Sequence, residues 1–212
     1  MKIIDVNVLK FHAVSNTVRD SEFHVHPGPQ HDTVEKVLVI KCDDGTEGIA
    51  FGPMDERVIL STVKEILIGE DPFFRERIWR RLVQLQRLRR NLTEDTLCAV
   101  DVAIWDICGK KLNLPVSKIL GQYRETIPAY ASIMVGDDIP GGLDTPEAYA
   151  SFAASLVNQG YKAIKLHTWM PPIVPEPSVK MDLEAARKVR EEVGEDITLL
   201  MDPYHFYSRE EA

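Results

Sequence analysis

Apolar segments on both sides of a short polar turn predict that the chain begins with an antiparallel sheet. The run "VLVIKCDDGTEGIAFG", Val37 to Gly52, places Asp44 and Gly45 between two β-rich segments. Aspartate and glycine accept the positive φ of a tight turn, so this pattern is typical of a β-hairpin.

From Asp71 the apolar residues take a helical spacing. Asp71 can cap a helix, and Pro72 suits its first position. The apolar face of this helix is expected to comprise Phe74, Ile78, Leu82 and Leu85. A second helix is expected after Thr93, because acidic residues fill its first turn, where the helix dipole favours them. Its apolar face is expected to comprise Leu97, Val100, Ile104 and Ile107.

After Gly121 the signals for strands and helices alternate, which predicts parallel βαβ units. The expected strands are "IPAYASIMV", "YKAIKLH" and "ITLLMD", with helices from Thr145 to about Gly160 and up to about Gly194. We therefore predict an α/β protein with an α+β domain at residues 1–124 and a parallel α/β domain at residues 125–212. Long loops are expected at His24–Asp32, Gly136–Asp144 and Met170–Pro177.

The composition narrows the class of protein. With 44% hydrophobic residues among 212, the chain can form one large domain or two small ones. A net charge of -8 argues against nonspecific binding of nucleic acid, and the seven arginines from Arg75 to Arg90 are typical of a solvated helix face. The cysteines, Cys42, Cys98 and Cys108, have no CxxC spacing and are expected to be reduced, buried thiols. No signal-peptide core or membrane-length apolar run occurs, so we expect a soluble cytoplasmic protein.

The strand "YKAIKLH" ends with two ionisable side chains on one face. Alternation along a strand places Lys165 and His167 on one side and Ile164 and Leu166 on the other. Taken singly, the lysine is explained by a side chain that reaches solvent, and the histidine by a hydrogen-bonded structural role.

The next strand ends in a similar way. Asp202 follows an apolar run and precedes "PYH", which contains His205. Asp202 alone is also explained as a turn former, and His205 as a loop residue that packs against tyrosines. Because active sites of parallel barrels collect at the C-terminal ends of the strands, the joint placement of Lys165, His167 and Asp202 favours a functional site.

A longer segment resembles a known family. The run "AVDVAIWDICGKKLNLPVSKILGQYRETIPAYAS", Ala99 to Ser132, is similar to the junction of capping domain and barrel in the mandelate racemase/muconate-lactonizing branch of the enolase superfamily. The order of "WDICGK", "LPVSKILG" and "IPAYAS" carries this likeness, and the hairpin "DDGTEGIAFG" is similar to that family's N-terminal sheet. The resemblance implies an α+β capping domain at residues 1–124, followed at 125–212 by about three strands of a (β/α) TIM-type barrel.

The resemblance also implies a metal-dependent enzyme. Members of this branch hold Mg²⁺ through three carboxylates, remove the proton α to a substrate carboxylate and stabilise the enediolate on the metal. Lys165 matches the first lysine of the family's Lys-x-Lys motif, as general base or as the cation that neutralises the carboxylate. Asp202 matches the first metal carboxylate, at the end of the third barrel strand.

Departures from the family pattern keep the reaction open. His167 stands where many members have a second lysine, and an imidazole can act as base, acid or binding group. Tyr204 stands where members often have a polar residue, and His205 is a candidate acid or substrate ligand. The chain ends at Ala212, ahead of the other expected metal carboxylates. We therefore expect an N-terminal piece of a longer protein, inactive by itself; a degenerate relative that needs a partner chain is the alternative.

Two loops of the expected capping domain supply polar groups. The segments Ser21–Asp32 and Phe51–Val58 are predicted to contact substrate, and their hydrogen-bonding side chains suit a polyhydroxy acid. The candidate binding residues are His24, His26, Asp55 and Arg57, together with His205.

These expectations predict a Mg²⁺-dependent dehydratase of acid sugars. A base would remove the α-proton, and an acid would expel the β-hydroxyl as water. A racemase or epimerase of the same superfamily is the alternative reaction. A non-catalytic binding module is the alternative of another class. The resemblance implies a homo-oligomer, a dimer or an octamer, with a small carboxylate substrate. The acidic net charge and the lack of a membrane-length apolar run predict that neither nucleic acid nor membrane is a partner.

Overall fold

The structure is a computed structural model of the chain, and it describes residues 1–19, 25–89, 91–134, 143–167, 178–203 and 207–210. The chain divides into two compact units. The N-terminal unit comprises Met1–Ser15 and Asp32–Glu125, and the C-terminal unit comprises Asn16–His31 and Thr126–Ala212.

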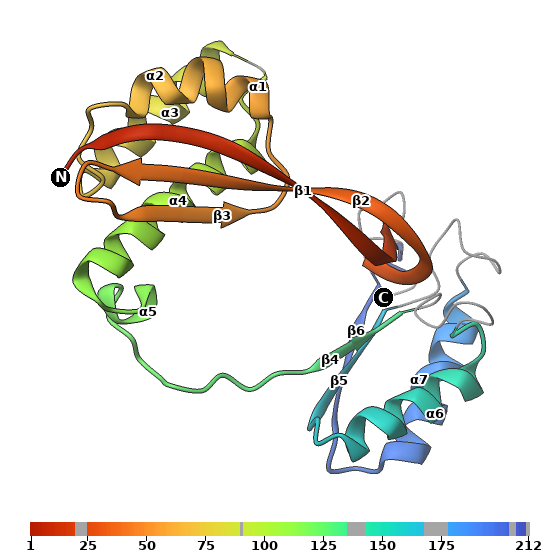
Figure 1. The fold of residues 1–212 in the computed structure, drawn as a ribbon. Helices are drawn as coiled ribbons and strands as arrows, with labels where there is room; N and C mark the ends of the chain where they lie inside the picture. Colours follow the sequence, from red (N-terminus) through yellow and green to blue (C-terminus); the bar gives the residue numbers. More distant parts are fainter. Residues whose placement is uncertain (20–24, 90, 135–142, 168–177, 204–206, 211–212) are drawn as a thin grey trace. The chain divides into compact units, whose positions relative to one another are not determined.

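The described elements are labelled in Figure 1. The strands are β1 (Ile3–Arg19), β2 (Val25–Cys42), β3 (Glu47–Phe51), β4 (Ala131–Ile133), β5 (Ala163–His167) and β6 (Thr198–Asp202). The helices are α1 (Glu56–Val58), a π-helical turn (Ile59–Val63), α2 (Lys64–Leu67), α3 (Arg75–Leu88), α4 (Glu94–Leu112), α5 (Val116–Ile119), α6 (Pro146–Asn158) and α7 (Val179–Val193).

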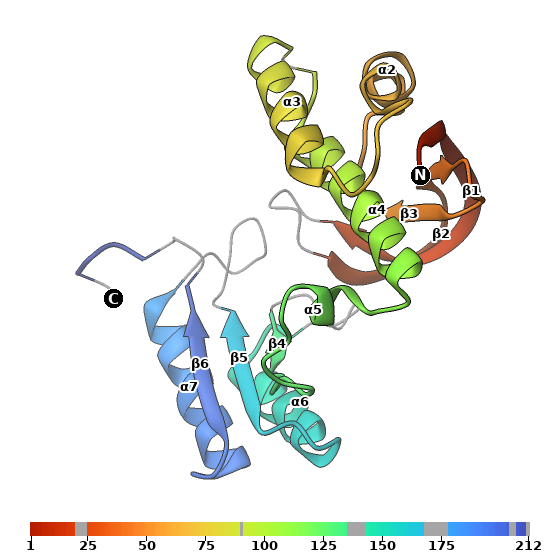
Figure 2. The same cartoon turned by 90° about the vertical axis from the view of Figure 1, so that its left-hand side faces the viewer.

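The first sheet has the order β1-β2-β3, and β2 pairs antiparallel with β3, so the predicted hairpin is confirmed. Helix α4 packs closely on β3, as Figure 2 shows. Gly48 permits this approach, because a Cβ there would lie 2.0 Å from the carbonyl oxygen of Ala103. The Ile49 N–H also donates to Asp106 Oδ2 at 2.8 Å. The main chain of the edge strand is thereby fixed to the helix.

Helix α4 agrees closely with the prediction. Thr93 caps it, since its Oγ1 accepts the N–H of Thr96 at 3.3 Å, and all four residues of the predicted apolar face are buried. Helix α3 begins later than predicted, at Arg75. Asp71 Oδ1 instead accepts the N–H of Phe73 at 3.0 Å, in a turn that leaves Phe74 exposed. The prediction that Asp71 and Pro72 open the helix is therefore wrong.

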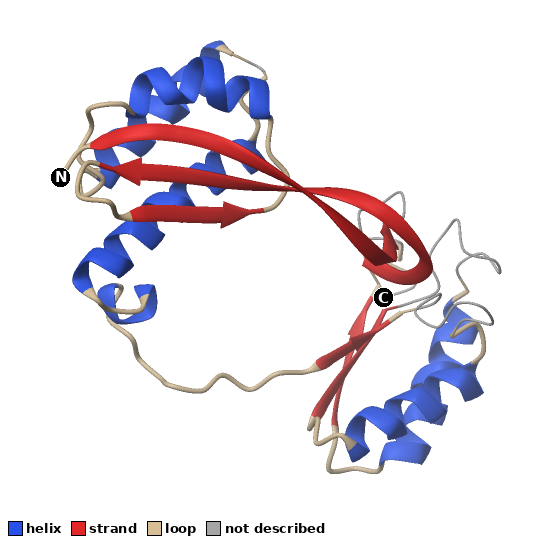
Figure 3. Cartoon of the chain, viewed as in Figure 1, coloured by secondary structure: helices blue, strands red, loops and turns tan. Residues whose placement is uncertain are grey.

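The second sheet is parallel, in the order β4-β5-β6, and α6 and α7 lie along one of its faces (Figure 3). Thr145 caps α6 by accepting the N–H of Ala148, and Ser178 caps α7 by accepting that of Met181. The described strand β4 is shorter than the segment predicted for it. The predicted fold class, an α+β part followed by parallel strand–helix units, is confirmed.

Two segments predicted as loops contain regular structure. Strand β2 begins at Val25, so the described part of His24–Asp32 is strand. Gly28 contributes to this, because a Cβ there would lie 2.6 Å from Val18 Cγ1. The segment Phe51–Val58 is β-strand at its start and helix from Glu56 onward. The loops predicted at Gly136–Asp144 and Met170–Pro177 lie mostly or wholly outside the described residues.

The cysteine prediction is correct in part. Cys42 and Cys108 are buried free thiols, but Cys98 is exposed because it lies on the outward side of α4. Among the described helices, none combines the length and the apolar character that crossing a membrane would require.

Candidate functional site

Strand β5 separates an apolar face from a polar one, as its sequence predicts. Ile164 and Leu166 are buried in the core under α6 and α7. Lys165 and His167 occupy the opposite face, because successive side chains of a strand alternate. Core packing therefore explains Ile164 and Leu166, whereas Lys165 and His167 are available for binding or proton transfer.

Three ionisable groups meet at the C-terminal end of this sheet. Lys165 Nζ lies 3.0 Å from Asp202 Oδ2, with the two side chains 18% and 37% exposed. His167 Nε2 lies 3.9 Å from the same oxygen, and its side chain is 8% exposed. The parallel register places His167 directly beside Asp202. The structure thus brings Lys165, His167 and Asp202 into one cluster.

Two tyrosines that the sequence reasoning missed also contact this cluster. The ring of Tyr130 lies 5.4 Å from Lys165 Nζ, within the range of a cation–π interaction. The fully buried Tyr149 donates its hydroxyl to the carbonyl oxygen of His167 at 3.0 Å. This bond connects α6 to the end of β5. The helical spacing of α6 predicts that Tyr149 is buried, but the target of its hydroxyl depends on tertiary structure.

A further hydrogen bond secures the chain beyond β6. The hydroxyl of Tyr207 donates to the carboxylate of Asp182, which is buried in the first turn of α7. His205 and His24 lie outside the described residues. The side chain of His26 is likewise not described. These three predicted binding residues stay predictions.

The donor set within the described residues does not form a metal centre. No group of three or more His, Cys, Asp or Glu side chains with suitable geometry occurs in that part of the chain. Asp202 offers a carboxylate at a strand end, the type of ligand that Mg²⁺ prefers. It is suited to be one ligand, and further oxygen ligands would have to come from elsewhere.

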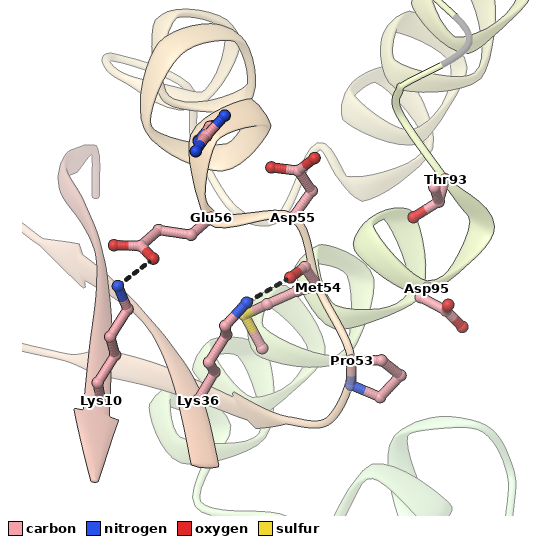
Figure 4. Close-up of a pocket in the computed structure, with 9 residues that line it drawn as sticks. Lys10, Lys36, Pro53, Met54, Asp55, Glu56, Thr93 and Asp95 are labelled. Carbon is pink, nitrogen blue, oxygen red and sulfur yellow. Dashed lines mark hydrogen bonds and ion pairs between the residues drawn. The ribbon is translucent and has the colours of Figure 1, made fainter. Parts of the chain in front are cut away.

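Asp55 and Arg57 line a polar pocket of about 600 Å³ within the N-terminal unit (Figure 4). Lys10 of β1 and Lys36 of β2 extend into it from the sheet. Thr93 and Asp95, at the start of α4, form another part of its wall. The sequence reasoning identified the pocket's loop but missed both lysines, because strand lysines carry no motif of their own.

Ion pairs elsewhere in the N-terminal unit shift the pKa of carboxyl groups without forming a site. The Lys64 ammonium hydrogen-bonds to Asp5 and holds the pKa of that carboxyl below its usual value. Lys111 of α4 does the same to the pKa of Asp44, which lies in the β2–β3 turn. Burial raises the pKa of the Cys42 thiol to about 11, so this thiol is protonated at neutral pH. These groups are structural.

Two family models match the chain. Residues 13–121 match the mandelate racemase/muconate lactonizing enzyme N-terminal domain, and residues 148–212 match the enolase C-terminal domain-like family. The first match lies in the sheet–helix part of the chain, and the second begins within α6 of the parallel strand–helix part.

Individual relatives share this arrangement over about half of their length. The chain is 34% identical to a D-galactarolactone cycloisomerase of Agrobacterium fabrum, covering 83% of this chain and 46% of that protein. It is 30% identical to an arabinonate dehydratase of Saccharolobus solfataricus, covering 78% and 43%. A crystal structure of D-glucarate dehydratase from Agrobacterium tumefaciens, complexed with magnesium, superposes with a TM-score of 0.92 at 47% identity. The match covers 100% of this chain and 56% of that one. The chain thus spans about half the length of the curated relatives it matches.

Proposed function

The chain belongs to the mandelate racemase/muconate lactonizing enzyme family, and from this premise we propose that the complete protein is a dehydratase of acid sugars. In this proposal residues 1–124 form the capping domain and residues 125–212 begin the catalytic barrel. The cluster of Lys165, His167 and Asp202 is the observation that carries the proposal. Relatives named glucarate, arabinonate and talarate/galactarate dehydratases support it.

The reaction divides between a base and an acid. A base takes the proton from the carbon α to the substrate carboxylate. An acid then gives a proton to the β-hydroxyl, which leaves as water. The resulting enol becomes a 2-keto-3-deoxy acid. The substrate loses one water molecule and nothing else, so the reaction needs neither an oxidant nor a reductant.

Lys165 and His167 are proposed for the proton-transfer and carboxylate-binding roles. Lys165 is largely withdrawn from solvent beside an acidic group, where its ammonium either binds the substrate carboxylate or, once deprotonated, takes the α-proton. His167 is buried at the same strand end, and an imidazole exchanges protons near neutral pH. The hydrogen bond from Tyr149 fixes the main chain that carries this imidazole.

Mg²⁺ is proposed as the cofactor of the complete protein, with Asp202 as one ligand. When bound, it would supply positive charge that stabilises the negative charge that develops on the substrate carboxylate after the α-proton is removed. Lys165 holds the Asp202 carboxylate at the strand end. A cation held by Asp202 would compete with this ammonium for the carboxylate.

The substrate is proposed to be a polyhydroxylated carboxylate. Asp55 and Arg57 line a polar pocket, which suits hydroxyl and carboxyl groups better than hydrocarbon. His24, His26 and His205 remain proposed binding residues on sequence grounds.

A panel of acid sugars tests the proposal. The complete protein, supplied with Mg²⁺, is expected to accumulate a 2-keto-3-deoxy acid from at least one of them. Exchange of the α-proton without ketone formation would show racemase or epimerase chemistry instead. Neither ketone nor exchange across aldarates, aldonates and their lactones would favour the non-catalytic module.

A further inference from the structure

We infer that Asp182 and Tyr207 are a positioning pair, whose hydrogen bond holds the end of β6 and with it the Asp202 carboxylate. Asp202 thereby stays beside Lys165 and His167, the other members of the ionisable cluster. Both residues of the pair serve the reaction of the proposed function, on which this inference rests. All five residues belong to the C-terminal unit, so no contact between the two units is involved.

Asp182 is a carboxylate on the core-facing side of α7. It is only 1% exposed and shares this side of the helix with the buried residues Ala185 and Val189. Among the described residues, no other aspartate or glutamate is buried. A buried carboxylate loses its hydration, so an apolar residue of similar size would cost less free energy at such a position. Core packing therefore does not explain why α7 carries an acidic residue here.

Tyr207 supplies this carboxylate with a hydrogen-bond donor. Its hydroxyl donates to Asp182 Oδ2 across 25 positions of the sequence. A hydrogen bond to a carboxylate is stronger than one between neutral groups, because the acceptor carries a charge. Asp182 also lies in the first turn of α7, where the helix dipole favours negative charge. The pair thereby attaches the chain beyond β6 to the start of α7.

This attachment lies at the same end of the sheet as the ionisable cluster. In a parallel strand–helix unit the helix runs back along the sheet, so α7 begins near the ends of β5 and β6 (Figure 1, Figure 2). His167 ends β5, Asp202 ends β6, and the two are paired in register. Residues 203–206 alone separate Asp202 from Tyr207. The bond at Tyr207 therefore limits how far the end of β6 can move.

Strand β6 gains from such an attachment because it has few other restraints. Within the described part of the chain it is paired on one side only, with β5. Leu200 and Met201, the residues before Asp202, are 39% and 41% exposed. Segments with few buried contacts open most readily. Since a shift of about 1 Å in a reacting group can cost about a hundredfold in rate, the position of this strand end matters for the reaction.

Hydrogen–deuterium exchange of the complete protein tests the positioning directly. In Tyr207→Phe, amides at the C-terminal end of β6 are expected to exchange faster by about tenfold or more, because the bond to α7 is lost. Amides of β4 and of the N-terminal core should keep their rates. Unchanged exchange in β6 overturns the inference. So does an equal increase throughout the protein, which would mean a general loss of stability.

Steady-state kinetics tests the consequence for the reaction. With the best acid sugar, Tyr207→Phe should lower kcat and kcat/KM together by about tenfold or more and leave KM nearly unchanged, because positioning matters most in the transition state. A purely structural bond would leave kcat of the folded protein as it was. Unchanged kcat, or a rise in KM alone, overturns the inference.

Tyr161→Phe is the matched control. It removes the same hydroxyl in the same unit, at an exposed position before β5. Its kcat and its exchange rates should equal those of the unmodified protein, and changes as large as those of Tyr207→Phe would overturn the inference.

Asp182→Asn separates the hydrogen bond from the charge. The amide oxygen still accepts a hydroxyl, so kcat and the exchange of β6 should stay closer to those of the unmodified protein than in Tyr207→Phe. A greater loss than in Tyr207→Phe would assign the effect to the charge of Asp182 and would contradict the role of the pair.

Failure of the proposed function gives a different result. If the complete protein turns over no acid sugar, the exchange measurement decides alone. Faster exchange confined to the end of β6 in Tyr207→Phe, and absent in Tyr161→Phe, supports the positioning pair. Exchange that is unchanged, or faster throughout the protein, overturns it.

Discussion

Both sheets of the molecule bury one face under helices, but their other faces differ. In the N-terminal sheet, the face away from the helices carries exposed apolar residues, including Leu9, Phe11 and Phe51. In the C-terminal sheet, the face away from α6 and α7 carries Lys165, His167 and Asp202. The same alternation of side chains serves packing in both units. The outward face of the N-terminal sheet combines apolar residues with a Lys41–Glu47 ion pair, whereas that of the C-terminal sheet brings a lysine, a histidine and an aspartate together at the strand ends.

The ion pairs of the two units differ in how far their lysines are exposed to solvent. Lys64–Asp5 and Lys111–Asp44 join distant segments of the N-terminal unit near its surface. Ion pairs at a protein surface are weak stabilisers, because water already solvates both charges. The Lys165 side chain is more withdrawn from solvent than either of those lysines. A partly buried pair is a weak stabiliser once desolvation is counted, which favours a functional reason for its presence.

The largest expected effect comes from removing the Lys165 charge. In the complete protein, Lys165→Met should lower kcat by about a hundredfold to ten-thousandfold, the usual contribution of a proton-transfer group. Steady-state kinetics with the best acid sugar measures this. Lys162→Met is the control, because Lys162 is an exposed residue just before β5, and it should keep full activity. Comparable turnover by both variants would remove Lys165 from the site.

In the N-terminal unit, substitutions in the hydrophobic core should lower the free energy of unfolding. Ile104→Ala removes a buried side chain of α4 and should lower the free energy of unfolding by about 2–5 kcal/mol. Val102→Ala, on the exposed side of the same helix, is the matched control and should change it by less than about 1 kcal/mol. Urea unfolding followed by circular dichroism measures both. Equal losses would mean that the core has been placed wrongly.

A smaller effect is expected from Tyr149→Phe. The substitution removes the hydroxyl that donates to the His167 carbonyl and should cost about 1 kcal/mol of unfolding free energy. Since His167 is then held less firmly, the pH dependence of kcat should also change. Tyr161→Phe, at an exposed position before β5, is the control. A loss of stability with an unaltered pH profile would assign Tyr149 a purely structural role.

The smallest effect concerns the surface pair of Asp5 and Lys64. The pKa of Asp5 is lowered from its ordinary value of 3.8, chiefly by the Lys64 hydrogen bond. Asp5 therefore contributes stability above that value and loses it as the pH falls through the lowered pKa of the folded state. Asp5→Asn should reduce the unfolding free energy at pH 7, and the difference from the unmodified chain should shrink at acid pH. A difference that is independent of pH would contradict this assignment.

The sequence predicts the strand faces and most element types, because these depend on local periodicity. Ile164 and Leu166 are buried as predicted, and so is the apolar face of α4. Features that depend on distant partners were missed. Lys36 lies in a pocket only because α1 and α4 begin beside its strand, and the need for glycine at position 28 depends on the close approach of Val18. The start of α3 was misplaced because a turn competes for the Asp71 carboxylate.

Loss of an α-deuterium label tests the central claim most directly. The complete protein and its Lys165→Met variant are each given acid sugar labelled at the α-carbon, and proton NMR follows the label and the ketone together. The account predicts that the unmodified protein releases the label to water as it forms the 2-keto-3-deoxy acid, and that the variant does both far more slowly. Release of the label at the same rate by both proteins, or ketone that still carries it, would contradict the assignment of proton transfer to this strand face.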